Sequence, residues 1–143
     1  MEKNQIYIKC GTNYKEMTKE LLETCRLSEL IGDRKKRIAI KPNLVSPTEA
    51  SFGATTHPEI VEGILEYLKT EGFSKVVMME GSWVGDRTSD ACEVCGYREL
   101  SERFQVPFID TQKEKGFSRD CVGMELNLCA CVKDVDFLIN VPV

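Results

Sequence analysis

The chain has 143 residues, 42% of them hydrophobic and 29% charged, with a formal net charge of −4. This length fits one domain that buries a core without disulfide bonds, and the negative charge gives no electrostatic reason to bind nucleic acid or an anionic membrane surface. No segment approaches the ~18 apolar residues of a membrane span, and polar residues 1–5 lack the apolar stretch of a secretory signal. We therefore expect a cytoplasmic protein without nucleic-acid or membrane partners.

The first half of the chain alternates predicted strands and helices. Residues 6–8 (IYI) predict a strand, and residues 13–25 combine a capping-box pattern with apolar side chains at four-residue intervals, which predicts a helix. A second strand is predicted at residues 38–40, followed by a long polar stretch at residues 44–56. Residues 58–71 then form an apolar stripe of helical period that begins with proline and ends before glycine.

The second half continues this alternation. Residues 76–79 are an uninterrupted apolar run, as expected for a strand covered on both faces of a parallel sheet. Short helices are predicted around residues 90–95 and 97–104, and strands at residues 106–109 and 137–139.

One segment is ambiguous. Polar and apolar residues alternate over part of residues 124–132, and we interpret this stretch as a strand. Strands that alternate with helices indicate crossover connections. The predicted fold class is therefore α/β, with a three-layer, Rossmann-like arrangement in which a mostly parallel sheet carries helices on both faces, over a single domain at residues 1–143.

Polar side chains follow the apolar part of four predicted strands. In open α/β sheets, ligands bind outside the carboxyl ends of the strands, and these ends share one edge. We expect a small anionic ligand there, although polar strand ends are also explained by the solubility of loops. The candidate ligand-binding residues at these strand ends are Lys41, Asn43, Gly81, Ser82 and Asn140.

A further candidate site precedes the helix at residues 58–71. Thr55 and Thr56 place two hydroxyl groups, and His57 an imidazole, at a helix N-terminus that favours an anion. A well-formed helix cap is the alternative explanation. His57 is the only histidine, and an imidazole is the side chain that most often serves as a general base near neutral pH. His57 and Glu80 are therefore the candidate catalytic residues, although a lone histidine at a cap is more often structural.

The seven cysteines are odd in number and scattered, which is typical of free thiols or metal ligands in a reducing compartment. Cys92 and Cys95 form a C-x-x-C pair, and Cys129 and Cys131 form a C-x-C pair. Four thiolates can bind zinc or an iron–sulfur cluster where they converge. Packing of cysteine as a small core residue is the alternative, which we favour over metal or redox roles.

These strand-end motifs, taken in order, resemble the DUF362 domain family. The resemblance runs from residues 41–44 (KPNL) through residues 55–59 (TTHPE), residues 76–82 (VVMMEGS) and residues 96–100 (GYREL), and includes residues 106–110 (VPFID). It ends at residues 136–142 (DFLINVP) and so covers most of the chain after residue ~36. No single motif is decisive, but their succession is specific.

The resemblance implies a fold more than an activity, because the family name records a domain of unknown function. Members of the family often carry a ferredoxin-like [4Fe–4S] segment, which implies redox-linked roles. The sequence stops at residue 143, where the family normally continues, and contains no C-x-x-C-x-x-C motif. We therefore expect the N-terminal part of a longer domain, with a [4Fe–4S] cluster only in a longer form.

Three functions remain open from the sequence. The chain is an enzyme or part of one that handles an anionic substrate, or a non-catalytic module that binds a small anion or cofactor. Alternatively, it is an interaction piece whose strand edge contacts a missing second half or another copy of the chain.

Overall fold

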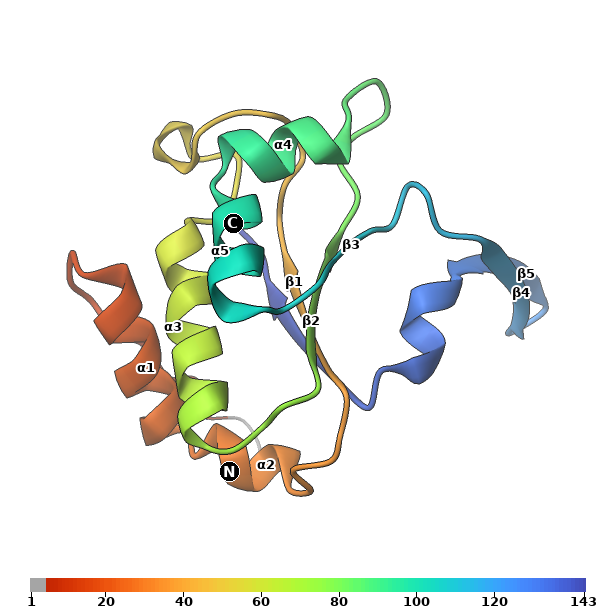
Figure 1. The fold of residues 1–143 in the computed structure, drawn as a ribbon. Coiled ribbons are helices and arrows are strands. Elements are labelled where there is room, and N and C mark those ends of the chain that lie inside the picture. The colour runs from red at the N-terminus through yellow and green to blue at the C-terminus, as the bar shows by residue number, and fades with distance from the viewer. Residues whose placement is uncertain (1–4) are drawn as a thin grey trace.

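The main sheet consists of four parallel strands in the order β3-β2-β1-β6, in a computed structural model that describes residues 5–143 (Figure 1). The strands are β1 (Ile38–Pro42), β2 (Val76–Glu80), β3 (Phe108–Asp110) and β6 (Phe137–Val141). In the register, Ile38 lies beside Val76 on one side and Phe137 on the other. The predictions of mixed α/β structure and of a parallel sheet are confirmed.

Five α-helices accompany the sheet in the described part of the chain. They are α1 (Tyr14–Thr24), α2 (Leu27–Ile31), α3 (Pro58–Thr70), α4 (Thr88–Val94) and α5 (Tyr97–Phe104). Helices α3 and α5 lie on the same side of the sheet, and α1 runs along the outer side of α3 (Figure 1). The predicted helices are all present. The short helix α2 was not predicted.

The two faces of the sheet are covered differently. Alternate strand residues such as Ile40 and Met78 pack with α3 and α5 in the larger core cluster. The opposite face presents Ala39, Val77 and Met79, which pack with Cys131 of the 3₁₀ helix η2 (Ala130–Asp134). Among residues 5–143, η2 is the helical element that packs on this second face.

A two-stranded antiparallel ribbon projects from the sheet, formed by β4 (Gly116–Cys121) and β5 (Met124–Cys129) (Figure 1). The strand predicted at residues 124–132 is confirmed over β5, and its remainder forms η2. Strand β4 was not predicted because Ser118, Arg119 and Asp120 interrupt any apolar run. One face of an antiparallel ribbon can remain hydrated, so β4 needs no continuous apolar run.

The strand predicted at residues 6–8 is wrong. Ile6 and Ile8 are exposed, and the segment pairs with no strand among residues 5–143. Three apolar residues specify a strand only where a neighbouring strand accepts their backbone hydrogen bonds. The polar residues 1–4, on which part of the localisation argument rests, lie outside the described residues.

The helix caps follow the sequence signals. The Asn13 side chain accepts a hydrogen bond from the backbone N–H of Glu16 at 3.3 Å and opens α1. Pro58 occupies the first turn of α3, and His57 is its N-cap. Over residues 5–143, no helix combines the length and the apolar character needed to cross a membrane.

Candidate functional site

The carboxyl ends of the four parallel strands each contribute one polar residue to a row along the edge of the sheet. Asn140 of β6 lies opposite Lys41 of β1, and Asp110 of β3 lies opposite Glu80 of β2. The order of the strands therefore gives the sequence Asn140, Lys41, Glu80 and Asp110 across the sheet edge. Parallel pairing explains this row, because every strand then ends at the same side of the sheet.

An ion pair between Lys41 and Glu80 occupies the centre of this row. Lys41 Nζ lies 2.7 Å from Glu80 Oε2, and the Lys41 side chain is 41% exposed whereas that of Glu80 is 6% exposed. Glu80 Oε1 also accepts a hydrogen bond from the backbone N–H of Leu44 at 3.3 Å. The carboxylate is therefore satisfied within the protein, and Lys41 presents the accessible charge of the pair.

Thr56 connects the long loop at residues 44–56 to both β1 and β6. Its hydroxyl group accepts a hydrogen bond from the backbone N–H of Asn43 at 2.8 Å and donates one to the carbonyl of Val141 at 2.7 Å. The Asn43 amide donates to the carbonyl of Ala54 at 3.0 Å. These bonds hold the start and end of the loop together at the sheet edge.

Thr55 and Tyr97 continue this buried network. The Thr55 hydroxyl donates to the carbonyl of Thr48 at 2.9 Å, and the Tyr97 hydroxyl donates to the carbonyl of Thr56 at 3.0 Å. Both threonines that precede α3 are buried, and their hydroxyl groups bond to backbone groups of the protein.

Ser82 anchors the loop that follows β2. Its hydroxyl donates to the carbonyl of Leu44 at 2.7 Å, and its backbone N–H donates to the hydroxyl of Thr88 at 3.1 Å. A Cβ atom at Gly81 would clash with the hydroxyl oxygen of Thr111, so the segments that follow β2 and β3 approach each other closely here.

Sequence reasoning missed Gln112, which holds the same loop from the other side. Its side-chain amide donates to the carbonyl of Ser82 at 2.9 Å and to that of Asp86 at 3.2 Å. The sequence signal was its position two residues after the polar end of β3. In the structure, Asp110 Oδ1 accepts a hydrogen bond from the Gln112 backbone N–H at 3.0 Å.

His57 makes its contacts away from the Lys41–Glu80 pair. Its ring centroid lies 4.4 Å from that of Tyr14 in α1, and its Nδ1 lies 3.8 Å from a carboxylate oxygen of Glu59. No hydrogen bond between described residues joins His57 to Lys41 or Glu80. The structure therefore separates the two candidate catalytic residues: His57 contacts Tyr14 and Glu59, whereas Glu80 pairs with Lys41.

The two cysteine pairs lie in different environments. Cys92 and Cys95 are buried in or next to α4, and Cys95 Sγ contacts the carbonyl of Thr48 at 3.2 Å. Burial raises the pKa of Cys92 to about 11, which keeps it a neutral thiol. The sulfur atoms of Cys129 and Cys131 lie 3.0 Å apart beside η2.

A [4Fe–4S] cluster requires converging cysteine thiolates. Over residues 5–143, no three cysteine, histidine, aspartate or glutamate side chains form a group that could hold a metal ion. The two cysteine pairs also lie in different core clusters, with Cys92 and Cys95 in the larger one and Cys129 and Cys131 in the one on the opposite face of the sheet. These residues, in this arrangement, do not fit a [4Fe–4S] cluster.

The comparison with protein families agrees with the order of the strand-end motifs. A family model described as "Domain of unknown function (DUF362)" matches residues 38–143. The chain belongs to the DUF362 family. The DUF362 match begins at β1 and includes all four parallel strands and every candidate residue at the sheet edge. A comparison with curated proteins and one with solved structures each found no match.

Proposed function

We propose that this DUF362 domain binds a small anion or an anionic cofactor at the carboxyl edge of its sheet, next to Lys41. The observation that carries the proposal is the juxtaposition of the exposed Asn140 with the half-exposed Lys41 on neighbouring strands. An ammonium group provides charge, and an adjacent amide provides a directional hydrogen bond to an anion.

The surrounding hydrogen bonds support this assignment by making the edge rigid. Thr56 and Ser82 hold the loops on either side of β1, and Glu80 fixes the position of the Lys41 ammonium group. A binding site gains affinity when its groups are already held in place. In this proposal Lys41 and Asn140 contact the ligand. Thr55, Thr56 and Ser82 do not contact it but hold the neighbouring loops in position.

Titration with phosphate, sulfate, acetate and citrate tests the proposal, with thermal stability and calorimetry as readouts. Lys41→Met removes the proposed ligand contact, and Lys41→Met combined with Glu80→Gln does so without leaving a buried carboxylate unpaired. The exposed Lys75, directly before β2 at the opposite end of the sheet, supplies the matched control Lys75→Met. We expect anions to stabilise the wild type and Lys75→Met, but neither Lys41 variant. Equal stabilisation of all four proteins would refute the site.

Three further expectations belong to this proposal. They are a cytoplasmic location, a three-layer Rossmann-like arrangement with helices on both faces, and a redox-linked role of a longer iron–sulfur-containing form. The proposed binding involves no cluster, because the described cysteines do not fit one.

A second candidate function is that of a non-catalytic interaction module, in which the strand edge and the projecting ribbon contact another polypeptide. The apolar face of the ribbon favours it. Met124, Leu126 and Leu128 alternate along β5 and are 62%, 39% and 38% exposed. A two-stranded ribbon is marginally stable by itself, so a partner would stabilise it.

Sedimentation analysis distinguishes this second function. We expect the wild type to associate with itself or with a longer DUF362 chain, and the variant Met124→Glu with Leu126→Glu to lose that association. The matched control Glu125→Lys with Asn127→Lys changes the opposite face of the same strand. A wild type that associates neither with itself nor with a longer DUF362 chain would contradict the interaction function.

A further inference from the structure

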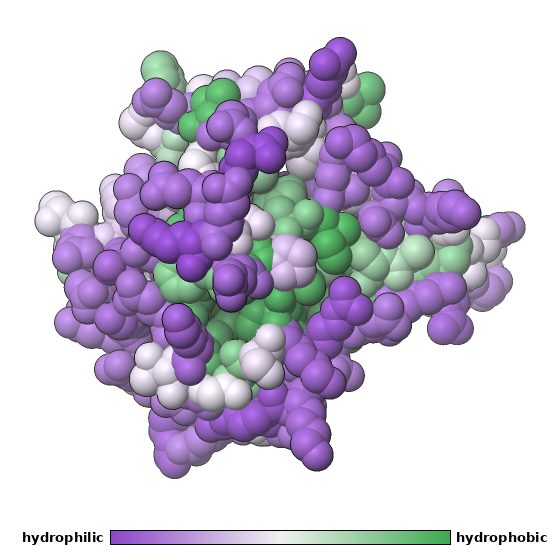
Figure 2. Space-filling view, viewed as in Figure 1, coloured by the Kyte–Doolittle hydropathy of each residue, from purple (hydrophilic) through white to green (hydrophobic). Residues whose placement is uncertain are grey.

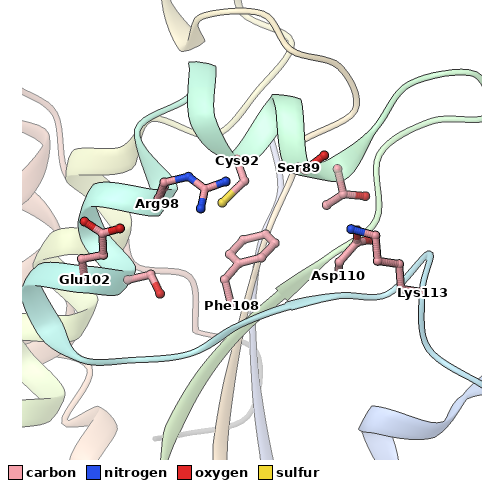
Figure 3. Close-up of a pocket in the computed structure, with 9 residues that line it drawn as sticks. Ser89, Cys92, Arg98, Glu102, Phe108, Asp110 and Lys113 are labelled. Carbon is pink, nitrogen blue, oxygen red and sulfur yellow. The ribbon is translucent and has the colours of Figure 1, made fainter.

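A cavity of about 240 Å³ lies between α4, α5 and β3, at the Asp110 end of the strand edge and on the far side of β2 from Lys41. Its floor is the ring of Phe108, with the Cys92 thiol above it (Figure 3). The ring of Tyr97 lies against Phe108 in an edge-to-face arrangement, with centroids 6.3 Å apart, and fixes this floor. In the space-filling view, apolar surface is visible at the centre of the molecule and is surrounded by hydrophilic side chains (Figure 2).

Charged groups flank this apolar floor on two sides. The Arg98 guanidinium extends from α5 toward Cys92, whereas Asp110 and Lys113 lie on the other side of Phe108 (Figure 3). Lys113 Nζ is 3.1 Å from Asp110 Oδ2, so these two charges are already paired. On the opposite side Arg98 pairs through its Nε with Glu93, so the donors still available to a ligand at the floor are the two Nη groups of Arg98.

Arg98 retains donors for such a ligand. Its Nε contacts the exposed carboxylate of Glu93, which leaves the two Nη groups directed toward Cys92 and the cavity (Figure 3). The planar guanidinium matches a carboxylate through two parallel hydrogen bonds.

We propose that this cavity binds a small monocarboxylate with a flat apolar body, whose carboxylate contacts Arg98 and whose body lies on Phe108. The cavity lining contains two cations, Arg98 and Lys113, and two carboxylates, Glu102 and Asp110, and the Glu93 carboxylate outside the lining pairs with Arg98. This balance favours a single negative charge over a doubly charged phosphate, because the carboxylates would repel the second charge. The hydroxyl groups of Ser89 and Ser101 line the same cavity.

Cys92 does not act as a nucleophile in this proposal. Burial raises the pKa of its thiol to about 11, with the charge of Arg98 opposing and that of Asp110 adding to the effect. At neutral pH the neutral thiol is a polarizable contact for the ligand body. The proposed function of the cavity is thus binding, without a covalent step.

Benzoate is the probe for this site, and amide chemical shifts in two-dimensional NMR are the readout, since they detect weak binding and locate it. We expect benzoate to shift amides of α4, α5 and β3, while benzyl alcohol at the same concentration shifts them far less. Binding of benzyl alcohol equal to benzoate would overturn the role of Arg98. Tighter binding of phenyl phosphate than of benzoate would overturn the monocarboxylate class.

The variant Arg98→Met keeps the apolar stem and removes the guanidinium, and we expect it to weaken benzoate binding at least about tenfold. Arg103→Met is the matched control on the same helix, because Arg103 pairs with Glu62 instead. Ser89→Phe, which fills the cavity mouth, should also abolish the shifts. Unchanged benzoate binding in both Arg98→Met and Ser89→Phe would refute the site. The Lys41 variants should bind benzoate as the wild type does, so failure of either site is distinguishable.

Discussion

Lys41 and Glu80 form an ion pair across β1 and β2 in which the carboxylate is almost fully buried and the ammonium group is partly exposed. The asymmetry has an energetic consequence. When Glu80 is neutralised, Lys41 regains water, but when Lys41 is removed, the Glu80 carboxylate keeps only the N–H of Leu44 as a partner among the described residues.

We therefore predict that Lys41→Met destabilises the domain by about 2 kcal/mol, and Glu80→Gln by about 1 kcal/mol. The double variant should cost less than the sum of the two, since no buried charge remains unpaired. Urea denaturation of the four proteins measures this coupling. Strict additivity would show that the pair contributes nothing to stability.

Thr56→Val should destabilise the domain by about 2 kcal/mol, because it leaves the N–H of Asn43 and the carbonyl of Val141 without their partner. Thr56→Ser keeps the hydroxyl and should cost much less. Hydrogen exchange provides a local readout, in which the amide of Asn43 loses protection in Thr56→Val only. Equal effects of the two variants would show that the hydroxyl group contributes no more to stability than the γ-methyl group that Thr56→Ser removes.

Gly63→Ala tests the packing of α1 on α3. A Cβ atom at residue 63 would lie 2.7 Å from the carbonyl oxygen of Lys15, so α1 must move outward. We expect a destabilisation of about 1–3 kcal/mol from overpacking, although alanine by itself favours a helix by about 1 kcal/mol. Lys69→Ala, in the exposed last turn of α3, is the control and should be nearly neutral. A more stable Gly63→Ala would contradict the close approach of the helices.

Alkaline pH should weaken the fold through Cys92. Burial raises its pKa from 9.0 to about 11, so between these values the folded protein retains a proton that the unfolded chain releases. The stabilisation is complete below pH 9 and is lost as the pH rises toward about 11. Cys92→Ala should therefore show a smaller decline of unfolding free energy between about pH 8.5 and about pH 10.5. Parallel curves for the two proteins would exclude this contribution.

The strands of the main sheet were predictable because their signals are local. Residues 76–79 form an apolar run that needs burial on both faces, and Pro58 and Asn13 mark helix starts by backbone chemistry that involves only their near neighbours. Residues 6–8 show the limit of such signals. They have strand-forming side chains but no neighbouring strand among residues 5–143, which a local pattern cannot reveal.

The candidate site was predictable in its place but not in its roles. Strand ends are recognisable in the sequence, and Lys41, Glu80 and Asn140 do lie at the carboxyl ends of neighbouring strands, whereas their role as a ligand site stays a prediction. Whether a hydroxyl group faces a ligand or an internal carbonyl depends on residues far away in the chain. Thr56 illustrates this, since its acceptor is the carbonyl of Val141, 85 residues later.

The alternation of strands and helices, the family and the polar strand ends can all be read from the amino-acid order, because they follow from periodicity and from neighbours along the chain. Three relationships require the folded chain: Lys41 pairs with Glu80, His57 lies against Tyr14, and Arg98 flanks an apolar cavity over Phe108. They depend on the strand order and on how α4 and α5 pack beside β3. Burial and hydrogen bonding between distant segments set them, and these forces leave no pattern within any one segment.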